Sequence, residues 1–140
     1  IDFPRACMDE GYDFSFSGLK SAVLNYLNAK KMKNEEIVVE DVAASFQEAV
    51  VEVLSTKAIK AAKEKGYDTI ALAGGVAANS ALREKLTTMC SKENISVKYP
   101  SLILCTDNAA MIGCAGYYNF INKKIHDMSL NAVPNLKIGE

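Results

Sequence analysis

Residues 69–80 read TIALAGGVAANS, and this stretch decides how the chain folds. The uncharged run TIALA, which contains a β-branched isoleucine, predicts a short buried strand. Gly74 and Gly75 can adopt backbone angles that other residues avoid, so the chain can turn sharply where the strand ends. Asn79 then stands at the predicted start of a helix that runs to about Cys90.

A strand, a glycine turn and a helix in this order can form a cradle for a phosphate or a nucleotide. The free N–H groups and the positive dipole end at a helix N-terminus favour an anion. Glycines without side chains also let a ligand approach the backbone closely. Such turns nevertheless occur more often without a ligand, so this stretch alone leaves a binding loop and a bare turn both open.

A second stretch, CTDNAAM at residues 105–111, places an acidic side chain at the start of another predicted helix. This helix is expected to run to about Asn122, and it is rich in alanine and glycine, which let a helix lie close against a sheet or another helix. Asp107 has two interpretations. It can cap the helix with a side-chain oxygen, or its carboxylate can point into a cleft as a metal ligand.

Three motifs occur in one order along the chain: DFSFSGLK at 13–20, GGVAAN at 74–79 and TDNAAM at 106–111. Together they closely resemble the C-terminal part of the TsaD family, transferases that attach threonylcarbamoyl to a tRNA adenosine and were earlier described as O-sialoglycoprotein endopeptidases. The resemblance extends from about Asp13 to Pro134. It implies the α/β fold class, as the C-terminal lobe of an actin-like ATPase or ribonuclease H-like fold, with three layers and a central sheet.

The resemblance also implies the residues of a site. Asn79 matches the family asparagine that contacts the nucleotide part of the substrate, and Gly74 and Gly75 match the glycines of the same loop. Asp107 matches the family aspartate that ligates a divalent metal, iron or zinc. The family completes that metal site with two histidines of an HxxxH helix, whereas the one histidine of this chain is His126. We therefore expect the chain alone to bind metal weakly or not at all and to be inactive.

The implied reaction is an acyl transfer from threonylcarbamoyl-AMP to the exocyclic amine of the adenine 3′ of the anticodon, which forms t6A and releases AMP. In the family, a metal near the phosphate and carbonyl oxygens would act as a Lewis acid. The implied partners are tRNA, threonylcarbamoyl-AMP, and the paralogous subunit and the ATPase of the threonylcarbamoyladenosine complex. No catalytic residue is assigned, because no base can be identified as a partner for Ser17.

Other functions remain open at this point. An ATP-dependent kinase or ATPase of the same fold would share the glycine loop, but it would release ADP rather than AMP. A non-catalytic nucleotide-binding scaffold would share the loop as well, without turnover. A metalloprotease is disfavoured, because the sequence contains no HExxH motif.

The bulk properties narrow the class of protein. The length of 140 residues and the hydrophobic fraction of 49% suit one domain with a core. A net charge of −1 produces no overall field that would attract nucleic acid. No apolar run approaches ~20 residues, so no membrane span is expected. Four cysteines without a CxxC pair indicate buried or free thiols in a reducing cytoplasm.

We divide the chain into an irregular leader at 1–12, the lobe at 13–122 and a C-terminal tail at 123–140. The chain begins Ile-Asp-Phe-Pro without a methionine, and we interpret it as a piece of a longer protein. A lobe separated from its mate exposes apolar surface, so self-association of the chain is expected.

Alternation of aromatic and small polar residues over 13–17 predicts a strand, and Ser17 is expected to cap a helix over 20–28. Asp41 is expected to cap a long helix that ends near Gly66. The helix should keep its lysines on the solvent side, and Phe46→Asp should cost several kcal/mol, because a charge would enter the core. The predicted buried stripe of this helix consists of Val42, Phe46, Val50, Val53, Leu54, Ala58 and Ala61.

Further along, Leu82, Leu86 and Met89 are the predicted inward residues of the helix after the glycine turn. Arg83 and Lys85 on that helix are expected at the surface rather than on a phosphate. Residues 95–99 predict a strand, and the apolar run at 102–104 predicts either a further strand or a buried approach to Asp107. The last helix should bury Met111, Cys114, Ala115, Tyr118 and Ile121, and the tail should pack through Leu130, Val133 and Ile138.

Overall fold

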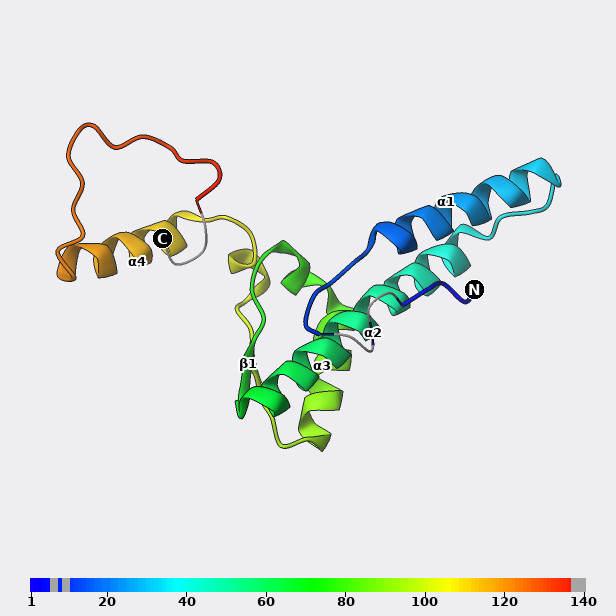
Figure 1. Ribbon diagram of the computed structural model, residues 1–140, viewed down its shortest axis with the longest axis horizontal. Coiled ribbons are helices and arrows are strands. Elements are labelled where there is room, and N and C mark those ends of the chain that lie inside the picture. The colour runs from blue at the N-terminus through cyan, green and yellow to red at the C-terminus, as the bar shows by residue number, and fades with distance from the viewer. Residues whose placement is uncertain (6–7, 9–10, 137–140) are drawn as a thin grey trace. The chain divides into compact units, whose positions relative to one another are not determined.

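The computed structural model describes residues 1–5, 8 and 11–136, and its chain forms two compact units, 1–106 and 107–140. The elements are drawn in Figure 1. The first unit contains α1 (Ser17–Met32), α2 (Val39–Lys65), β1 (Thr69–Ala71), the 3₁₀ turn η1 (Gly75–Ala78), α3 (Ser80–Lys92), β2 (Ser96–Lys98) and the 3₁₀ turn η2 (Leu102–Leu104), and the second contains α4 (Ala109–Ile121).

A parallel pair of strands forms the sheet of the first unit, with α3 as the connection between them. Ile70 pairs with Val97 in the register of the two strands. The Leu72 N–H donates to the carbonyl of Lys98 at 2.8 Å and continues the ladder beyond β1. The predicted strands at 69–73 and 95–99 and the helix between them are therefore confirmed, and the chain is an α/β protein.

The main core lies where α2, α3 and the sheet meet. Leu86 is 2% exposed and packs with Ile59 of α2 and with the sheet residue Ile70. The prediction that Leu82 and Leu86 point inward is thus confirmed. Cys90 belongs to the same cluster, and burial raises the pKa of its thiol.

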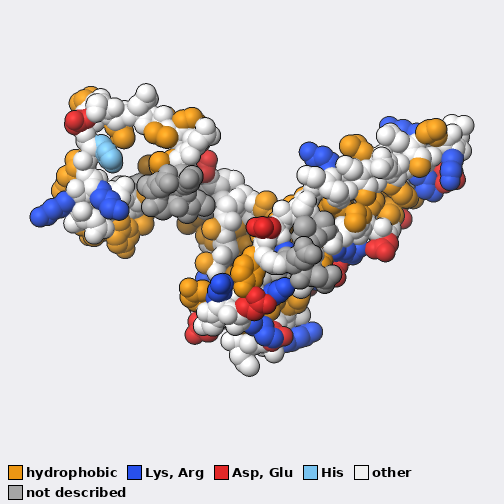
Figure 2. Space-filling model, in the orientation of Figure 1, with side chains coloured by type: hydrophobic (Ala, Val, Ile, Leu, Met, Phe, Trp, Pro, Cys, Tyr) orange, Lys and Arg blue, Asp and Glu red, His pale blue; other side chains and the backbone are white. Residues whose placement is uncertain are grey.

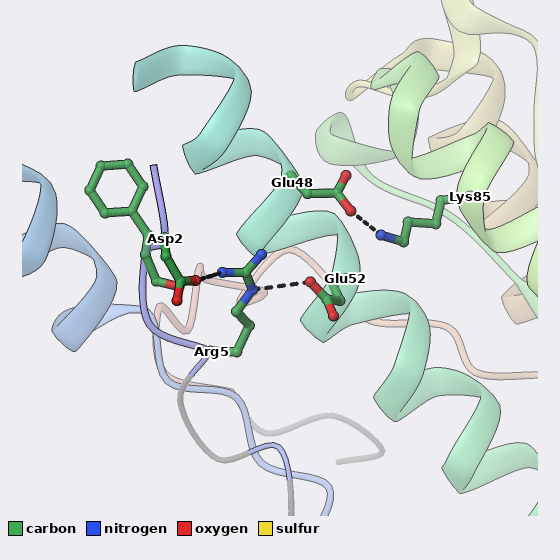
Figure 3. Close-up of polar contacts among 6 residues, drawn as sticks. Asp2, Arg5, Glu48, Glu52 and Lys85 are labelled. Carbon is green, nitrogen blue, oxygen red and sulfur yellow. Dashed lines mark hydrogen bonds and ion pairs between the residues drawn. The ribbon is translucent and has the colours of Figure 1, made fainter. Parts of the chain in front are cut away.

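A second cluster holds α1 against α2. Leu19 of α1 packs with Val42 and Ala49 of α2 and with Phe3 of the N-terminal segment. Figure 3 shows the ion pairs beside this cluster, where Arg5 bridges Asp2 at 2.8 Å and Glu52 of α2 at 3.0 Å. The same figure shows Lys85 of α3 paired with Glu48 of α2, which ties these two helices together at the surface.

The start of α1 differs from the prediction. Residues 13–17 lie in the described part of the chain and form no strand, and the cap of α1 is Phe16, without a side-chain hydrogen bond, rather than Ser17. The rings of Phe14 and Phe16 stack with centroids 6.4 Å apart. The Asp13 carbonyl accepts a hydrogen bond from Nζ of the buried Lys57 at 2.6 Å. This bond satisfies a carbonyl group that a neighbouring strand would satisfy in a sheet.

Helix α2 corrects three expectations and confirms one. It starts at Val39, so Asp41 lies in the first turn, where its charge suits the helix dipole, and is not the cap. Phe46 is 42% exposed instead of buried, because neither α1 nor α3 covers that side of the helix. Lys57, expected in solvent, is 1% exposed. The helix does end at Gly66, which has φ +72°.

The second unit also departs from the prediction. Residues 102–104, at the end of the first unit, form η2 and no strand, and the apolar side chains of α4 are exposed rather than buried. Leu130 and Val133 are exposed too, while Ile138 lies outside the described residues. Within this unit the described residues after α4 form neither helix nor strand that could cover it. Hydrophobic side chains at the surface of the unit are visible in Figure 2.

In the described part of the chain, no helix combines the length and the apolar character needed to cross a membrane.

Candidate nucleotide site

The glycine turn follows β1 directly. Gly74 has φ +85° and ψ 175°, a conformation that side-chain-bearing residues rarely adopt, and Gly75 opens η1. A Cβ built at either glycine meets no heavy atom within 4 Å. The described fold therefore requires Gly74 for its backbone angle, and the space in front of both glycines is open to a ligand.

Asn79 is the N-cap of α3, as the sequence predicts. Its Oδ1 accepts from the N–H of Leu82 at 2.9 Å, and its Nδ2 donates to Oε1 of Gln47 on α2 at 3.0 Å. The side chain is half-buried, and both ends of its amide are held by the protein. This arrangement presents the amide in one orientation at the end of the glycine turn.

An apolar groove of about 660 Å³ lies beside Asn79 in the first unit. One side is built by α2, and the other by Phe16 and by Val76 of the glycine turn. Two of the three sequence motifs therefore meet at one groove, which has the size and the mostly apolar lining of a small-molecule site. The α2 residues that line it are Ala43, Phe46, Gln47, Val50, Val51 and Leu54.

The contribution of α2 to this groove was missed at the level of sequence. Phe46, Val50 and Leu54 follow the helical spacing of a buried stripe, and that pattern does not distinguish a core from the wall of a groove. The available indication is Gln47, a polar neighbour of Phe46 outside the stripe, because a side chain with donors and acceptors can hydrogen-bond to a residue across a groove.

Asp107 begins the second unit and is exposed. The cap of α4 is its neighbour Asn108, whose Oδ1 accepts from the N–H of Met111 at 2.9 Å. The capping interpretation of Asp107 is therefore wrong.

The described residues contain no group of three or more His, Cys, Asp or Glu side chains that could hold a metal ion. Asp107 supplies one carboxylate, whereas protein metal sites use several ligands. The described residues thus do not fit a complete metal centre on their own. Cys90 and Cys105 are buried free thiols and Cys114 is an exposed one, as the absence of a CxxC pair predicts, and Cys7 lies outside the described residues.

The fold and this site define an α/β protein in which a parallel strand leads through a glycine turn into an asparagine-capped helix beside an apolar groove. The chain belongs to the TsaD family: the family described as tRNA N6-adenosine threonylcarbamoyltransferase matches residues 1–114. Family membership and the parallel sheet agree with the predicted fold class, one lobe of an actin-like or ribonuclease H-like fold.

Curated relatives are similar over the whole chain. A tRNA N6-adenosine threonylcarbamoyltransferase of Clostridioides difficile (strain 630) is 77% identical over 141 aligned residues, which cover 100% of this chain. Proteins of the same name from Clostridium perfringens (strain SM101) and Clostridium botulinum (strain 657) are 61% and 60% identical. In each case the chain spans 42% of the length of the relative.

Proposed function

We propose that this chain is the part of a tRNA N6-adenosine threonylcarbamoyltransferase that holds the nucleotide end of threonylcarbamoyl-AMP. The observation that carries the proposal is the Gly74–Asn79 loop, with its capped asparagine, in a chain that is 77% identical to a relative of that name. The substrates are threonylcarbamoyl-AMP and tRNA, and the products are t6A in the tRNA and AMP.

The geometry of the loop supports the roles that we propose for its residues. Gly74 and Gly75 leave open space through which the nucleotide can approach the backbone. Asn79 contacts the nucleotide with its amide, which exchanges or shares the hydrogen bond to Gln47. The apolar groove beside it keeps water from the bound nucleotide and so strengthens polar contacts in the site.

Asp107 is proposed as one ligand of a divalent metal, iron or zinc, in the whole enzyme. When bound, such a metal would supply Lewis-acid chemistry. Because the described residues do not complete a metal centre, the remaining ligands have to come from outside them. No reaction step is assigned to the metal from this chain.

The further partners of the proposal are the paralogous subunit and the ATPase of the threonylcarbamoyladenosine complex, and the place of action is the cytoplasm.

The experiment is a calorimetric titration of AMP into the chain and into two variants, Asn79→Ala and Asn79→Ser. Serine keeps an oxygen that can cap α3, whereas alanine removes both cap and amide, so the pair separates helix stability from nucleotide contact. We expect both variants to bind AMP about tenfold or more weakly than the native chain. Native-like binding by Asn79→Ser contradicts the role of the amide. Absence of AMP binding by the native chain contradicts the proposal that this part alone holds the nucleotide.

A further inference from the structure

We propose that Arg83 is a positioning residue for this site. Its side chain holds the glycine turn and the segment from Pro100 to Cys105 in one fixed arrangement. The inference rests on the proposed function, because it assigns Arg83 to the loop that would hold the nucleotide.

The side chain of Arg83 contacts the glycine turn. Arg83 extends from the first turns of α3 back toward η1, where its Nε donates to the carbonyl of Ala77. Ala77 is fully buried, and its N–H donates to the carbonyl of Gly74 at 3.0 Å. The backbone N–H of Arg83 also donates to the carbonyl of Asn79 at 3.2 Å. The side chain of Arg83 thus holds the middle of the turn, whereas its backbone bond to Asn79 is the first helical bond of α3, which any residue other than proline would make.

Arg83 also contacts the segment that follows β2. Nη2 of Arg83 donates to the carbonyl of Pro100 at 3.0 Å and lies 3.1 Å from Sγ of Cys105. The guanidinium also stacks on Tyr99, with Cζ 4.5 Å from the ring centroid. Cys105 is 3% exposed, so its thiol is closed in against this arginine.

These contacts suit an arginine and no other cation. The guanidinium is a rigid planar fork with several donors, so it can reach Ala77 on one side and Pro100 on another while its face lies on Tyr99. A lysine has a single ammonium group at the end of a flexible stem and cannot span the same acceptors. Arg83 is half-buried rather than on the surface, and its Nε and Nη2 donate to carbonyl groups of the protein rather than to a ligand.

The consequence concerns the geometry of the site. Asn79, at one side of the clamp, is proposed to contact the nucleotide, and the segment from Pro100 to Cys105 lies at the other side within the same unit. Small errors in the placement of binding groups are costly, because they misalign the ligand. Arg83 therefore acts on the site through the backbone it holds, without contacting the nucleotide itself.

The test compares Arg83→Met and Arg83→Lys with the control Lys85→Met in the chain of residues 1–140. Lys85 lies on the same helix, and its substitution removes the ion pair with Glu48. That ion pair does not involve the glycine turn. Three quantities are measured for each protein: the melting temperature, the Kd for AMP, and the alkylation rate of Cys105. Peptide mass spectrometry resolves each cysteine, and the exposed Cys114 serves as the internal reference.

We expect Arg83→Met and Arg83→Lys to weaken AMP binding about tenfold and to accelerate alkylation of Cys105 relative to Cys114 by a similar factor. Lys85→Met should leave the Kd for AMP and the alkylation rate of Cys105 within about twofold of the native values. This should hold even if Lys85→Met lowers the melting temperature as much as the Arg83 variants do. Native-like values in Arg83→Met, native-like values in Arg83→Lys, or equal changes in Lys85→Met overturn the proposal. If the native chain binds no AMP, the proposed nucleotide site fails, and the alkylation ratio decides alone on Arg83.

Discussion

At the scale of the residue, Lys57 shows how a single buried side chain can donate hydrogen bonds to backbone that forms no strand. Its position on α2 predicts a solvated charge, yet it is 1% exposed and its Nζ donates to the carbonyls of Asp13 and Gly11 at 2.6 and 3.4 Å. A buried ammonium group is costly without hydrogen-bond partners, and the irregular backbone before α1 provides carbonyl groups that accept from it. The Nζ of Lys57 also lies 6.0 Å from the centroid of the Phe14 ring.

Lys57→Met keeps the length of the side chain and removes its donors. We expect it to lower the free energy of unfolding by about 1–3 kcal/mol, because a part-buried, charged hydrogen bond from Lys57 to the Asp13 carbonyl is lost. Urea unfolding followed by circular dichroism measures the change. The matched control is Lys31→Met at an exposed position of α1, where the change should stay within about 0.5 kcal/mol. Equal effects of the two substitutions would show that Lys57 has no structural task.

At the scale of the element, helix ends were predicted better than helix starts. Gly66 ends α2 in the left-handed region, which glycine adopts at little cost, and the sequence position alone identifies it. Ser17 and Asp41 were both wrong as caps, because the helices start at or before them. Several residue types serve at an N-terminus, and propensity cannot choose among neighbouring positions when packing sets the first turn.

Gly66→Ala tests the end of α2. We expect it to lower the free energy of unfolding by about 1 kcal/mol, because alanine pays a steric penalty at φ +72° even though its Cβ would meet no neighbour. Gly18→Ala in α1 is the control, since its Cβ is also free of contacts and its backbone is helical, and it should be neutral or stabilising by up to about 1 kcal/mol. Thermal melting of both variants distinguishes backbone strain from a general effect of the added methyl group.

The packing between elements gives a second prediction. Leu86 of α3 is 2% exposed and packs against α2 and the sheet. Phe46 of α2 is 42% exposed and lines the groove. We expect Leu86→Ala to lower the free energy of unfolding by about 2–5 kcal/mol, and Phe46→Ala to cost clearly less, although phenylalanine is the larger side chain. Denaturant unfolding compares the two. A larger loss for Phe46→Ala would mean that the groove is filled in the folded chain.

At the scale of the whole molecule, each of the two units exposes apolar side chains, and the chain spans only part of the length of its relatives. The apolar side chains of α4 are exposed, and the groove on α2 is open within the first unit. The chain spans 42% of the length of the relatives it matches, and its described residues do not complete a metal centre. The activity is therefore proposed for the whole protein and not for the described residues alone.

The corresponding prediction is that the 140-residue chain alone has no threonylcarbamoyl transferase turnover on unmodified tRNA. After dialysis against zinc or ferrous iron, it should retain no stoichiometric metal, because Asp107 is a single ligand. Detection of t6A by mass spectrometry of the tRNA, and elemental analysis of the protein, measure the two outcomes. Turnover, or one tightly bound metal per chain that Asp107→Ala removes, would contradict the prediction.

The sequence by itself determined the family, the α/β class, the strands at 69–73 and 95–99, the glycine turn, and the positions of Asn79 and Gly66. These features depend on local patterns: an apolar run, glycine at a special backbone angle, and a side chain that caps its own helix. Only the tertiary structure decided that Phe46 lines a groove, that Lys57 is buried and that Arg83 clamps the glycine turn. Those outcomes depend on which segment, distant in the sequence, lies across from each side chain, and no local pattern contains that information.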